Sequence, residues 1–341
     1  MHCMSKHTPY KQDKYPCKED HHFSNFYGDT VLLINRMLGI LIGFLVLEML
    51  ISVVVILCTI GTDSPESITG HFTETLNDEV EVKCSLENNR FILCDCEKGR
   101  GIPLKRASFC PFKYLSVAEA AAIPLDVQSR GVDVGVAILL QSANQKVLLT
   151  RRSSSLRIFP NVWVPPGGHV ELDERLLDAG LRKLREETGL KLDPGDVSAQ
   201  LLGLWESVFP PMLSRGMPQR HHVVTYMLLN TSLTHQQLQA SLHPEPAEVS
   251  GCLWVDASLV KAIVSAVDGE EGSGTPQEGL APTISVLEVS PEGGLSESVL
   301  PLSVLCNRAP ASGEDVERVS TGTKYALELW LKNLEGQGTR C

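Results

Sequence analysis

The sequence predicts an α/β protein in which a mixed sheet lies between helices. The first observation behind this prediction is a set of short, apolar, strand-like segments at residues 132–140, 146–150, 205–209 and 223–229. The second is a set of segments that carry apolar residues at helical spacing, at 174–188, 258–267 and 317–334. Together these segments supply the strands of one sheet and the helices that would cover it.

A long apolar run at residues 37–60 precedes these elements. It is long enough to cross a bilayer, whereas a buried core helix, the alternative, is rarely apolar all round. We therefore expect a transmembrane helix and membrane association. Lys18 and Arg36 before the run, with Asp63 and Glu66 after it, would place the rest of the chain across the membrane. The scattered cysteines favour a reducing compartment instead, so the orientation stays open and a cytoplasmic location is the alternative.

The most informative stretch is a glycine turn followed by the helix at 174–188. Residues 165–168, Pro-Pro-Gly-Gly, cannot continue a strand or a helix, and Asp173 is a suitable N-cap for the helix. Leucines at helical spacing give the helix an apolar face, and Gly189 closes it as a C-cap.

Positions 183, 186 and 187 share one face of this helix because they are three and four residues apart. Carboxylates in such a group form a hard-oxygen site for Mg²⁺ or Mn²⁺. A chain of net charge −11 has little general attraction for a diphosphate, whose charge a bound metal can neutralise while making a water nucleophilic. Glu186 and Glu187 fit this chemistry; Lys183 does not, because an ammonium offers no lone pair. A solvated charged helix is the alternative.

Residues 168–190 resemble the nudix box, the signature of hydrolases that cut diphosphate linkages. The resemblance implies a nudix α/β/α sandwich, with a loop-helix-loop packed on its sheet, and a divalent metal cofactor. It implies that Glu186, Glu187 and the carbonyl of Gly168 bind the metal, with Glu187 as a catalytic residue.

Two positions of the box resemble a supporting pair of the family, and one position departs from the family. Glu174 and Arg182 look like the salt bridge in which the arginine orients the carboxylates. Lys183 stands where the family usually has a glutamate ligand. In one case Glu186, Glu187 and a distant carboxylate bind the metal, and the activity is weakened. Alternatively, Lys183 swings into solvent and leaves a two-carboxylate site, or the protein has kept binding and lost catalysis.

Further candidate site residues lie outside the box. Glu248 is the favoured general base, because nudix proteins can bring a glutamate of this segment to the metals; Glu245 is second, and a loop carboxylate in water is the alternative. Arg151 and Arg152 are candidates for contacts to substrate phosphates. His222 follows another histidine, and adjacent strand residues point to opposite faces. A substrate contact by His222 and a partly buried structural role are both open, and the structural role is favoured.

The resemblance extends beyond the box to one vertebrate subfamily. The segments that fit it are 109–112, 130–140, 147–152, 161–171, 204–207 and 318–331. The activity assigned to that subfamily implies removal of the N7-methylguanosine cap from mRNA with release of N7-methyl-GDP. Capped RNA, or a nucleotide diphosphate derivative, is then the expected substrate, and no protein partner is predicted. Two alternatives stay open: a catalytically weakened nudix-fold nucleotide-binding protein, and a hydrolase of a small dinucleotide such as a coenzyme A or ADP-ribose derivative.

Changes in composition divide the chain into six expected segments. These are an N-terminal tail at 1–36, the transmembrane helix at 37–60, an N-terminal extension at 61–127, the nudix hydrolase domain at 128–267, a flexible loop region at 268–315, and a C-terminal helix and tail at 316–341. The loop region is expected because residues 269–294 are rich in Gly, Pro, Ser and Glu.

Overall fold

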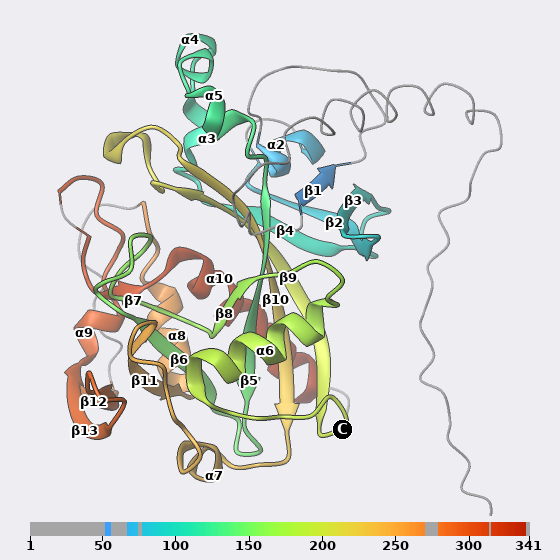
Figure 1. The fold of residues 1–341 in the computed structure, drawn as a ribbon. Helices are drawn as coiled ribbons and strands as arrows, with labels where there is room; N and C mark the ends of the chain where they lie inside the picture. Colours follow the sequence, from blue (N-terminus) through green and yellow to red (C-terminus); the bar gives the residue numbers. More distant parts are fainter. Residues whose placement is uncertain (1–51, 56–66, 74–76, 270–278, 314, 339–341) are drawn as a thin grey trace, which may run out of the picture. The chain divides into compact units, whose positions relative to one another are not determined.

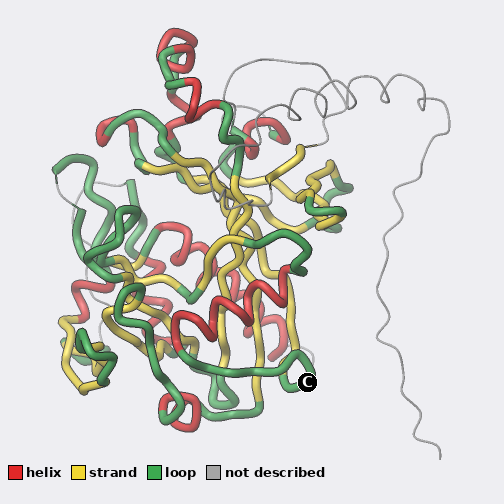
Figure 2. Tube along the Cα trace, viewed as in Figure 1, coloured by secondary structure: helices red, strands yellow, loops and turns green. Residues whose placement is uncertain are grey.

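A mixed sheet runs through the part of the chain that the structure describes. The structure is a computed structural model, and it describes residues 52–55, 67–73, 77–269, 279–313 and 315–338. All of these lie in one of the two units into which the chain divides, Met49–Cys341. In this unit one sheet of 14 strands carries helices on both faces (Figure 1). Figure 2 shows the strands in yellow through the centre and the helices in red around them.

Eleven strands follow one another across the sheet. Their order is β1 (Ser52–Val55), β3 (Arg90–Asp95), β2 (Glu79–Glu87), β4 (Ile102–Arg106), β9 (Val197–Phe209), β10 (Arg220–Thr231), β5 (Asp133–Gln141), β6 (Val147–Arg152), β11 (Val249–Val255), β12 (Thr283–Val289) and β13 (Leu295–Pro301). Three more join at the side: β8 (Gly167–His169) pairs with β5, and β7 (Val162–Val164) pairs with β6 and β14 (Arg318–Val319). The sheet is mixed because β10–β5 and β4–β9 are parallel while β9–β10 is antiparallel.

Among the described residues, most of the helices are short, and three are long enough to cover the sheet. The short ones are α2 (Ile68–Phe72), α3 (Pro111–Tyr114), α4 (Val117–Ala121), α5 (Leu125–Gln128), α7 (His235–Gln239), α9 (Leu302–Leu305) and the 3₁₀ turn Leu213–Arg215. The longer ones are α6 (Leu176–Thr188), α8 (Ala257–Ser265) and α10 (Thr321–Gly338).

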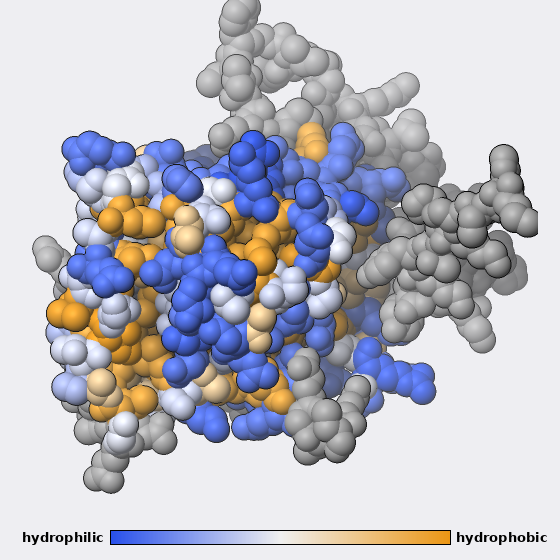
Figure 3. Space-filling view, turned by 90° about the horizontal axis from the view of Figure 1, so that it is seen from below, coloured by the Kyte–Doolittle hydropathy of each residue, from blue (hydrophilic) through white to orange (hydrophobic). Residues whose placement is uncertain are grey.

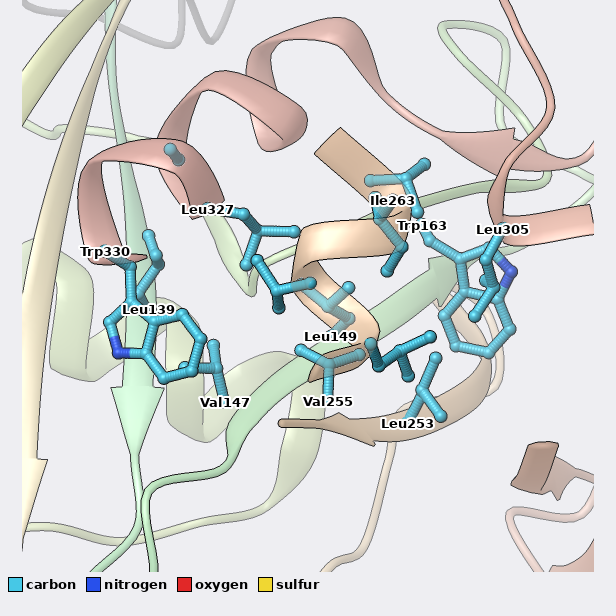
Figure 4. Close-up of a cluster of buried hydrophobic side chains, with 14 of the residues drawn as sticks. Leu139, Val147, Leu149, Trp163, Leu253, Val255, Ile263, Leu305, Leu327 and Trp330 are labelled. Carbon is cyan, nitrogen blue, oxygen red and sulfur yellow. The ribbon is translucent and has the colours of Figure 1, made fainter. Parts of the chain in front are cut away.

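The two faces of the central strand β5 pack against different helices. Alternate residues of β5, such as Val134, share a buried cluster with Leu184 of α6. The intervening residues, such as Leu139, share a second cluster with Ile263 of α8 and Trp330 of α10 (Figure 4). A strand that is buried on both faces has a continuous apolar sequence, as β5 does. This arrangement confirms the predicted α/β class with a mixed sheet between helices.

The box helix α6 ends where the sequence predicts and begins elsewhere. Gly189 takes φ 75° and its N–H donates to the carbonyl of Arg185 at 2.9 Å. Asp173 is not the N-cap, because Arg175 occupies that position. The backbone of Asp173 is itself left-handed, with φ 61°, and its N–H donates to Asn89 Oδ1 at 2.6 Å. A contact from the N-terminal extension therefore overrides the local capping preference.

The predicted transmembrane helix falls mostly outside the described residues. Its described part, Ser52–Val55, forms strand β1, which pairs in parallel with β3, so a helix is wrong for these residues. Consecutive β-branched valines favour a strand once a neighbouring edge is available. Across the described ranges, no helix has both the length and the apolar character that crossing a bilayer requires. On the face seen in Figure 3, apolar residues form separate patches between hydrophilic ones.

The predicted flexible loop region at 268–315 contains regular structure. Strands β12 and β13 pair antiparallel along their full lengths within it, so the prediction is wrong there, while residues 270–278 lie outside the described part. The predicted cap of the second helix is corrected too: α8 begins after Asp256, whose side chain accepts from the Leu259 N–H, and not after Ser258. Helix α10 begins at Thr321 and not at 317, because the preceding β14 pairs with β7.

The N-terminal extension shares its sheet with the rest of the unit. Strand β4 pairs in parallel with β9, in a register that aligns Leu104 with Leu204. Strands β2 and β3 continue outward from β4. Both leucines lie in the same buried cluster as Val134 and Leu184, so the extension and the box helix share one hydrophobic core.

Candidate active site

The glycine turn of the box forms the short strand β8 beside β5. Its register aligns Gly168 with Val136. A Cβ at Gly167 would collide with the carbonyl oxygen of Val136, so this close approach requires glycine. A Cβ at Gly168 would lie 2.7 Å from Cε of Lys183, which shows that the Lys183 side chain runs directly past the turn.

Glu187 is buried beneath this strand, near the C-terminal end of α6. Its side chain is 6% exposed, and its Oε1 accepts a hydrogen bond of 3.2 Å from the Gly167 N–H. Burial raises the pKa of Glu187 to about 8; the Gly167 hydrogen bond opposes this rise and the charge of Glu248 adds to it. A buried carboxylate next to a second carboxylate is strongly stabilised by a nearby cation.

The structure distinguishes the two candidate bases. Glu248 is half-buried, and its charge influences the pKa values of both Glu187 and Arg152. Glu245 is exposed, and its carboxylate accepts from the Ala247 N–H at 3.3 Å. Glu248 therefore lies in electrostatic contact with the buried carboxylate, as a general base or metal ligand has to.

Glu186, the neighbour of Glu187, has a different environment. Lys183 Nζ lies 2.8 Å from Glu186 Oε2, and Arg182 Nη1 lies 3.3 Å from the same carboxylate. Burial acts to raise the pKa of Glu186, but hydrogen bonds from Lys183 and Arg182 outweigh it and lower the pKa. The Lys183 side chain is 20% exposed, so it has folded back onto Glu186 and has not swung into solvent.

Arg182 holds the start of the box against β8. Its Nε and Nη2 donate to the two carboxylate oxygens of Glu174 at 2.6 and 2.8 Å. Nη2 also donates to the carbonyl of His169 at 3.1 Å. The hydrogen bonds from Arg182 lower the pKa of Glu174. A bidentate pair of this kind fixes orientation as well as charge, which suits a positioning role.

A pocket of about 290 Å³ adjoins the box through Gly167 and Gly168. Several of its lining residues, among them Trp205 and Tyr226, belong to the cluster on the α10 side of the sheet. Other aromatic rings that line it are Phe109, Phe159, His169 and His222. The pocket thus joins apolar, aromatic walls to a glycine-lined edge, where the Gly167 N–H donates to Glu187.

Two of the predicted residues outside the box line this pocket, and a third does not. Arg152 and His222 are in its wall. Arg152 Nη2 donates to the Ile158 carbonyl at 2.9 Å, which ties the pocket loop to β6. Arg151 is engaged elsewhere, in ion pairs with Glu288 and, at 3.2 Å, with Glu317. Neighbouring strand residues point to opposite faces, so Arg152 faces the pocket and Arg151 does not line it. The phosphate contact of Arg151 stays a prediction.

Arg318 is a pocket residue that the sequence analysis missed. It is 2% exposed, it lines the pocket, and its Nη1 has no hydrogen-bond partner within the described residues. Its Nε lies 3.4 Å from Asp315. A buried guanidinium with a free donor is suited to an anionic or carbonyl ligand. The segment containing Arg318 was identified by resemblance, but its position in the pocket wall depends on the pairing of β14 with β7.

The adjacent histidines point to opposite faces, as their spacing on β10 requires. His221 Nε2 lies 2.9 Å from the fully buried carboxylate of Glu206. His222 Nε2 faces the pocket side and lies 3.6 Å from Asp133 Oδ2. Burial lowers the pKa of His222 to about 3, and the charges of His169 and His221 contribute to the decrease.

The chemistry of the box residues fits one divalent cation with a preference for oxygen. Glu187 and Glu248 supply carboxylates, and the carbonyl of Gly168 lies at the same turn. Glu186, the other predicted ligand, is paired with Lys183 Nζ at 2.8 Å, so its role as a metal ligand stays a prediction. For metal binding, this box therefore has fewer carboxylates than a box with glutamate at position 183.

A mixed sheet between helices, with a glycine strand and a carboxylate-bearing helix against it, defines a nudix fold. The family model described as "NUDIX domain" matches residues 129–270. The chain belongs to the nudix hydrolase family.

Three curated vertebrate relatives extend the match beyond this domain. All three have the name m7GpppN-mRNA hydrolase NUDT17. The relative from Danio rerio is 68% identical over 270 residues, which cover 79% of this chain and 90% of the relative. The relative from Xenopus laevis is 54% identical over 278 residues, covering 81% and 92%. The relative from Homo sapiens is 46% identical over 259 residues, covering 74% and 78%.

Proposed function

We propose that this nudix hydrolase removes the N7-methylguanosine cap from mRNA and releases N7-methyl-GDP. The names of its vertebrate relatives support this substrate. The observation that carries the proposal is the pocket of about 290 Å³ that joins aromatic walls to the glycine strand of the box. It suits a planar, positively charged base on one side and a diphosphate on the other.

The pocket residues would bind the base. The rings of Trp205 and Phe159 line the pocket and offer flat surfaces for stacking, worth on the order of 1–3 kcal/mol for each base. A methylated, cationic guanine also gains from the negative face of an aromatic ring. Arg318 supplies a buried donor for a base carbonyl or a phosphate oxygen.

The box residues would act on the diphosphate. Glu187 and Glu248, with the Gly168 carbonyl, would hold Mg²⁺ or Mn²⁺, which supplies charge neutralisation and a more acidic water. Glu248 is the residue we assign to take the proton of the attacking water. Arg182 keeps β8 and the start of α6 in place through Glu174 and the His169 carbonyl. Lys183 contributes a positive charge beside the turn, where a family member with glutamate would have a ligand.

The Lys183–Glu186 ion pair gives weight to a second candidate, a nucleotide-binding protein with little turnover. With one glutamate replaced and another held by an ammonium, the box has less charge with which to bind metal. The two candidates differ in one measurable respect, which is metal-dependent product release by the native chain.

The test is the release of N7-methyl-GDP from capped RNA by the full chain, measured by mass spectrometry with Mg²⁺ and with Mn²⁺. The variants are Glu187→Gln and Lys183→Glu, and free coenzyme A and ADP-ribose are assayed alongside. We expect native turnover that Glu187→Gln decreases by on the order of 10²-fold or more, and that Lys183→Glu increases.

The other outcomes contradict the proposal in different ways. An inactive native chain that Lys183→Glu restores would favour the binding protein. Turnover of coenzyme A or ADP-ribose in preference to capped RNA would reject the cap as the substrate. Turnover that is unaffected by Glu187→Gln would mean that the box does not carry the reaction.

A further inference from the structure

Three neighbouring strands bring a carboxylate and two imidazoles together on the pocket side of the sheet. In the parallel pair β10–β5, His222 lies opposite Asp133. In the antiparallel pair β5–β8, His169 lies opposite Gly135. Asp133 and Gly135 are two residues apart and face the same side of β5. Since Gly135 has no side chain, the ring of His169 can turn across it toward Asp133.

The ligand atoms of this cluster lie close to one another. Asp133 Oδ2 is 3.6 Å from His222 Nε2 and 4.0 Å from His169 Nε2. All three ligand atoms lie within 4.8 Å of one another. Ligands of a tetrahedral zinc ion, at bond lengths of 2.0–2.2 Å, are about 3.4 Å apart. Small side-chain rotations are therefore enough to close the cluster around an ion.

The carboxylate of Asp133 is buried and incompletely bonded. Asp133 is 5% exposed, and its Oδ2 has no hydrogen-bond partner within the described residues. Buried carboxylate oxygens normally have such partners, because leaving one without a partner is costly. This oxygen is aimed at the two imidazoles, so it needs a partner at the centre of the cluster.

Arg220 is the charged neighbour that a cation would have to displace. Its Nη1 lies 3.6 Å from Asp133 Oδ2, and its side chain is 34% exposed. No hydrogen bond joins the two groups at this distance. Because Arg220 is partly exposed, its guanidinium can move toward water when an ion binds.

We propose that Asp133, His169 and His222 form a binding site for a divalent transition-metal ion, best matched by Zn²⁺, with an open coordination position toward the pocket. Two imidazole nitrogens and one carboxylate oxygen are a ligand set that zinc prefers and that Mg²⁺ does not. His169 and His222 both line the pocket, so the remaining position is open to a water or an anionic oxygen of a ligand.

This zinc site is distinct from the metal site of the box. Glu187 of the box belongs to α6, which packs on the face of β5 that carries Val134. Asp133 belongs to the opposite face, because successive strand residues alternate. The zinc site therefore does not depend on the proposed cap substrate, and metal binding can test it without any assay of turnover.

The experiment measures zinc bound by the full chain, purified without a histidine tag, stripped with a chelator and dialysed against Zn²⁺. The residues outside the described part include further histidines and cysteines, so the readout is the difference between variants of the same chain. We expect His222→Ala and Asp133→Asn each to bind one Zn²⁺ fewer than native, with at least about 100-fold weaker affinity at this site. His243→Ala, an exposed histidine outside the cluster, is the matched control and keeps native zinc content.

A second measurement uses only the native chain, in case a variant does not fold. Mass spectrometry follows hydrogen–deuterium exchange at the C2 carbon of each histidine, with and without Zn²⁺. We expect Zn²⁺ to slow exchange at His169 and His222 and to leave His243 unchanged. Equal zinc content in native protein and folded His222→Ala, or unchanged exchange at both pocket histidines, overturns the proposal.

Discussion

At the residue scale, two adjacent glutamates of α6 have opposite environments. Glu187 is buried below the Gly167 N–H with its pKa raised to about 8, chiefly by burial. Glu186 is 42% exposed and paired with Lys183 at 2.8 Å. The two neighbours therefore differ in charge compensation. Glu187 is buried and would be stabilised by a bound cation, whereas the charge of the exposed Glu186 is already neutralised by Lys183. Lys183 affects the box through Glu186 more directly than through Glu187.

The general base can be identified by comparing Glu248→Gln with Glu245→Gln. Glu248 is in electrostatic contact with Glu187, whereas Glu245 is exposed and caps a local turn. We expect Glu248→Gln to decrease kcat for release of N7-methyl-GDP by on the order of 10²-fold or more, and Glu245→Gln to change it less than about threefold. Steady-state kinetics on both variants is the measurement, and the reverse order of effects would assign the role to Glu245.

A buried carboxylate away from the box is predicted to stabilise the fold. Glu206 accepts hydrogen bonds from Ser67 Oγ, from the Ile68 and Thr69 N–H groups and from His221, all within 2.9 Å. Burial acts to raise the pKa of Glu206, but the hydrogen bonds from His221 and Thr69 outweigh it and lower the pKa to about 2.

Glu206→Gln should decrease the free energy of unfolding by about 3 kcal/mol at pH 7. Because the folded pKa is below the unfolded value, this stabilisation is present above about pH 4.5 and is lost as the pH falls toward 2. Urea unfolding at several pH values measures the difference between native and variant. Glu297→Gln, an exposed glutamate on β13, is the control and should change stability by less than about 0.5 kcal/mol. If Glu206→Gln changes the free energy of unfolding as little as the control does, the hydrogen bonds to Glu206 do not contribute to stability.

Sequence alone could identify the residues of the box but not the cluster beside it. Gly168, Glu186 and Glu187 lie within one loop and helix, so their spacing determines their geometry. Asp133 and His169 come from separate strands, and they meet His222 only through the registers of two strand pairs. No local pattern encodes such a register. The sequence also could not distinguish Arg151 from Arg152, of which the structure places Arg152 in the pocket wall.

At the element scale, the approach of β8 to β5 requires glycine at position 167. A Cβ there would overlap the Val136 carbonyl oxygen, which belongs to the backbone and cannot move aside. Gly167→Ala should therefore decrease the free energy of unfolding by about 1–3 kcal/mol and impair turnover, because β8 carries Gly168 and His169. Gly195→Ala is the matched control, with open space around its Cβ position. Thermal unfolding measures both, and equal stability of the two variants would show that β8 can move without cost.

Element ends were harder to predict than element types, and each error has a tertiary cause. Asp173 has the side chain of an N-cap, but its backbone bonds to Asn89 of the extension instead. The C-terminal helix starts later than its pattern suggests, because Arg318 and Val319 form β14 and pair with β7 instead. The glycine-rich region contains the β12–β13 hairpin, whose partner β11 is distant in sequence. In each case a partner far along the chain decides a local outcome.

At the scale of the whole molecule, the extension and the nudix domain share one sheet and one core. Strands β2, β3 and β4 reach β9 by pairing, and Leu104 of β4 is fully buried beside Leu204. The boundary predicted at residue 127 is therefore not a boundary in the packing, because the residues before and after it share one sheet and one core. Such continuity favours a single cooperative unfolding transition for the described unit.

This cooperativity predicts that a core substitution in the extension destabilises the nudix domain. Leu104→Ala should decrease the free energy of unfolding by about 2–5 kcal/mol, because it removes a buried side chain and leaves a cavity. Leu125→Ala, on α5 of the same extension and 78% exposed, is the matched control and should change it by less than about 0.5 kcal/mol. The measurement is amide hydrogen exchange in α6 and α10, which pack on opposite faces of the sheet and so report on the stability of each face. If Leu104→Ala speeds exchange in the extension while α6 and α10 keep native protection, the two parts unfold independently and the shared core does not couple them.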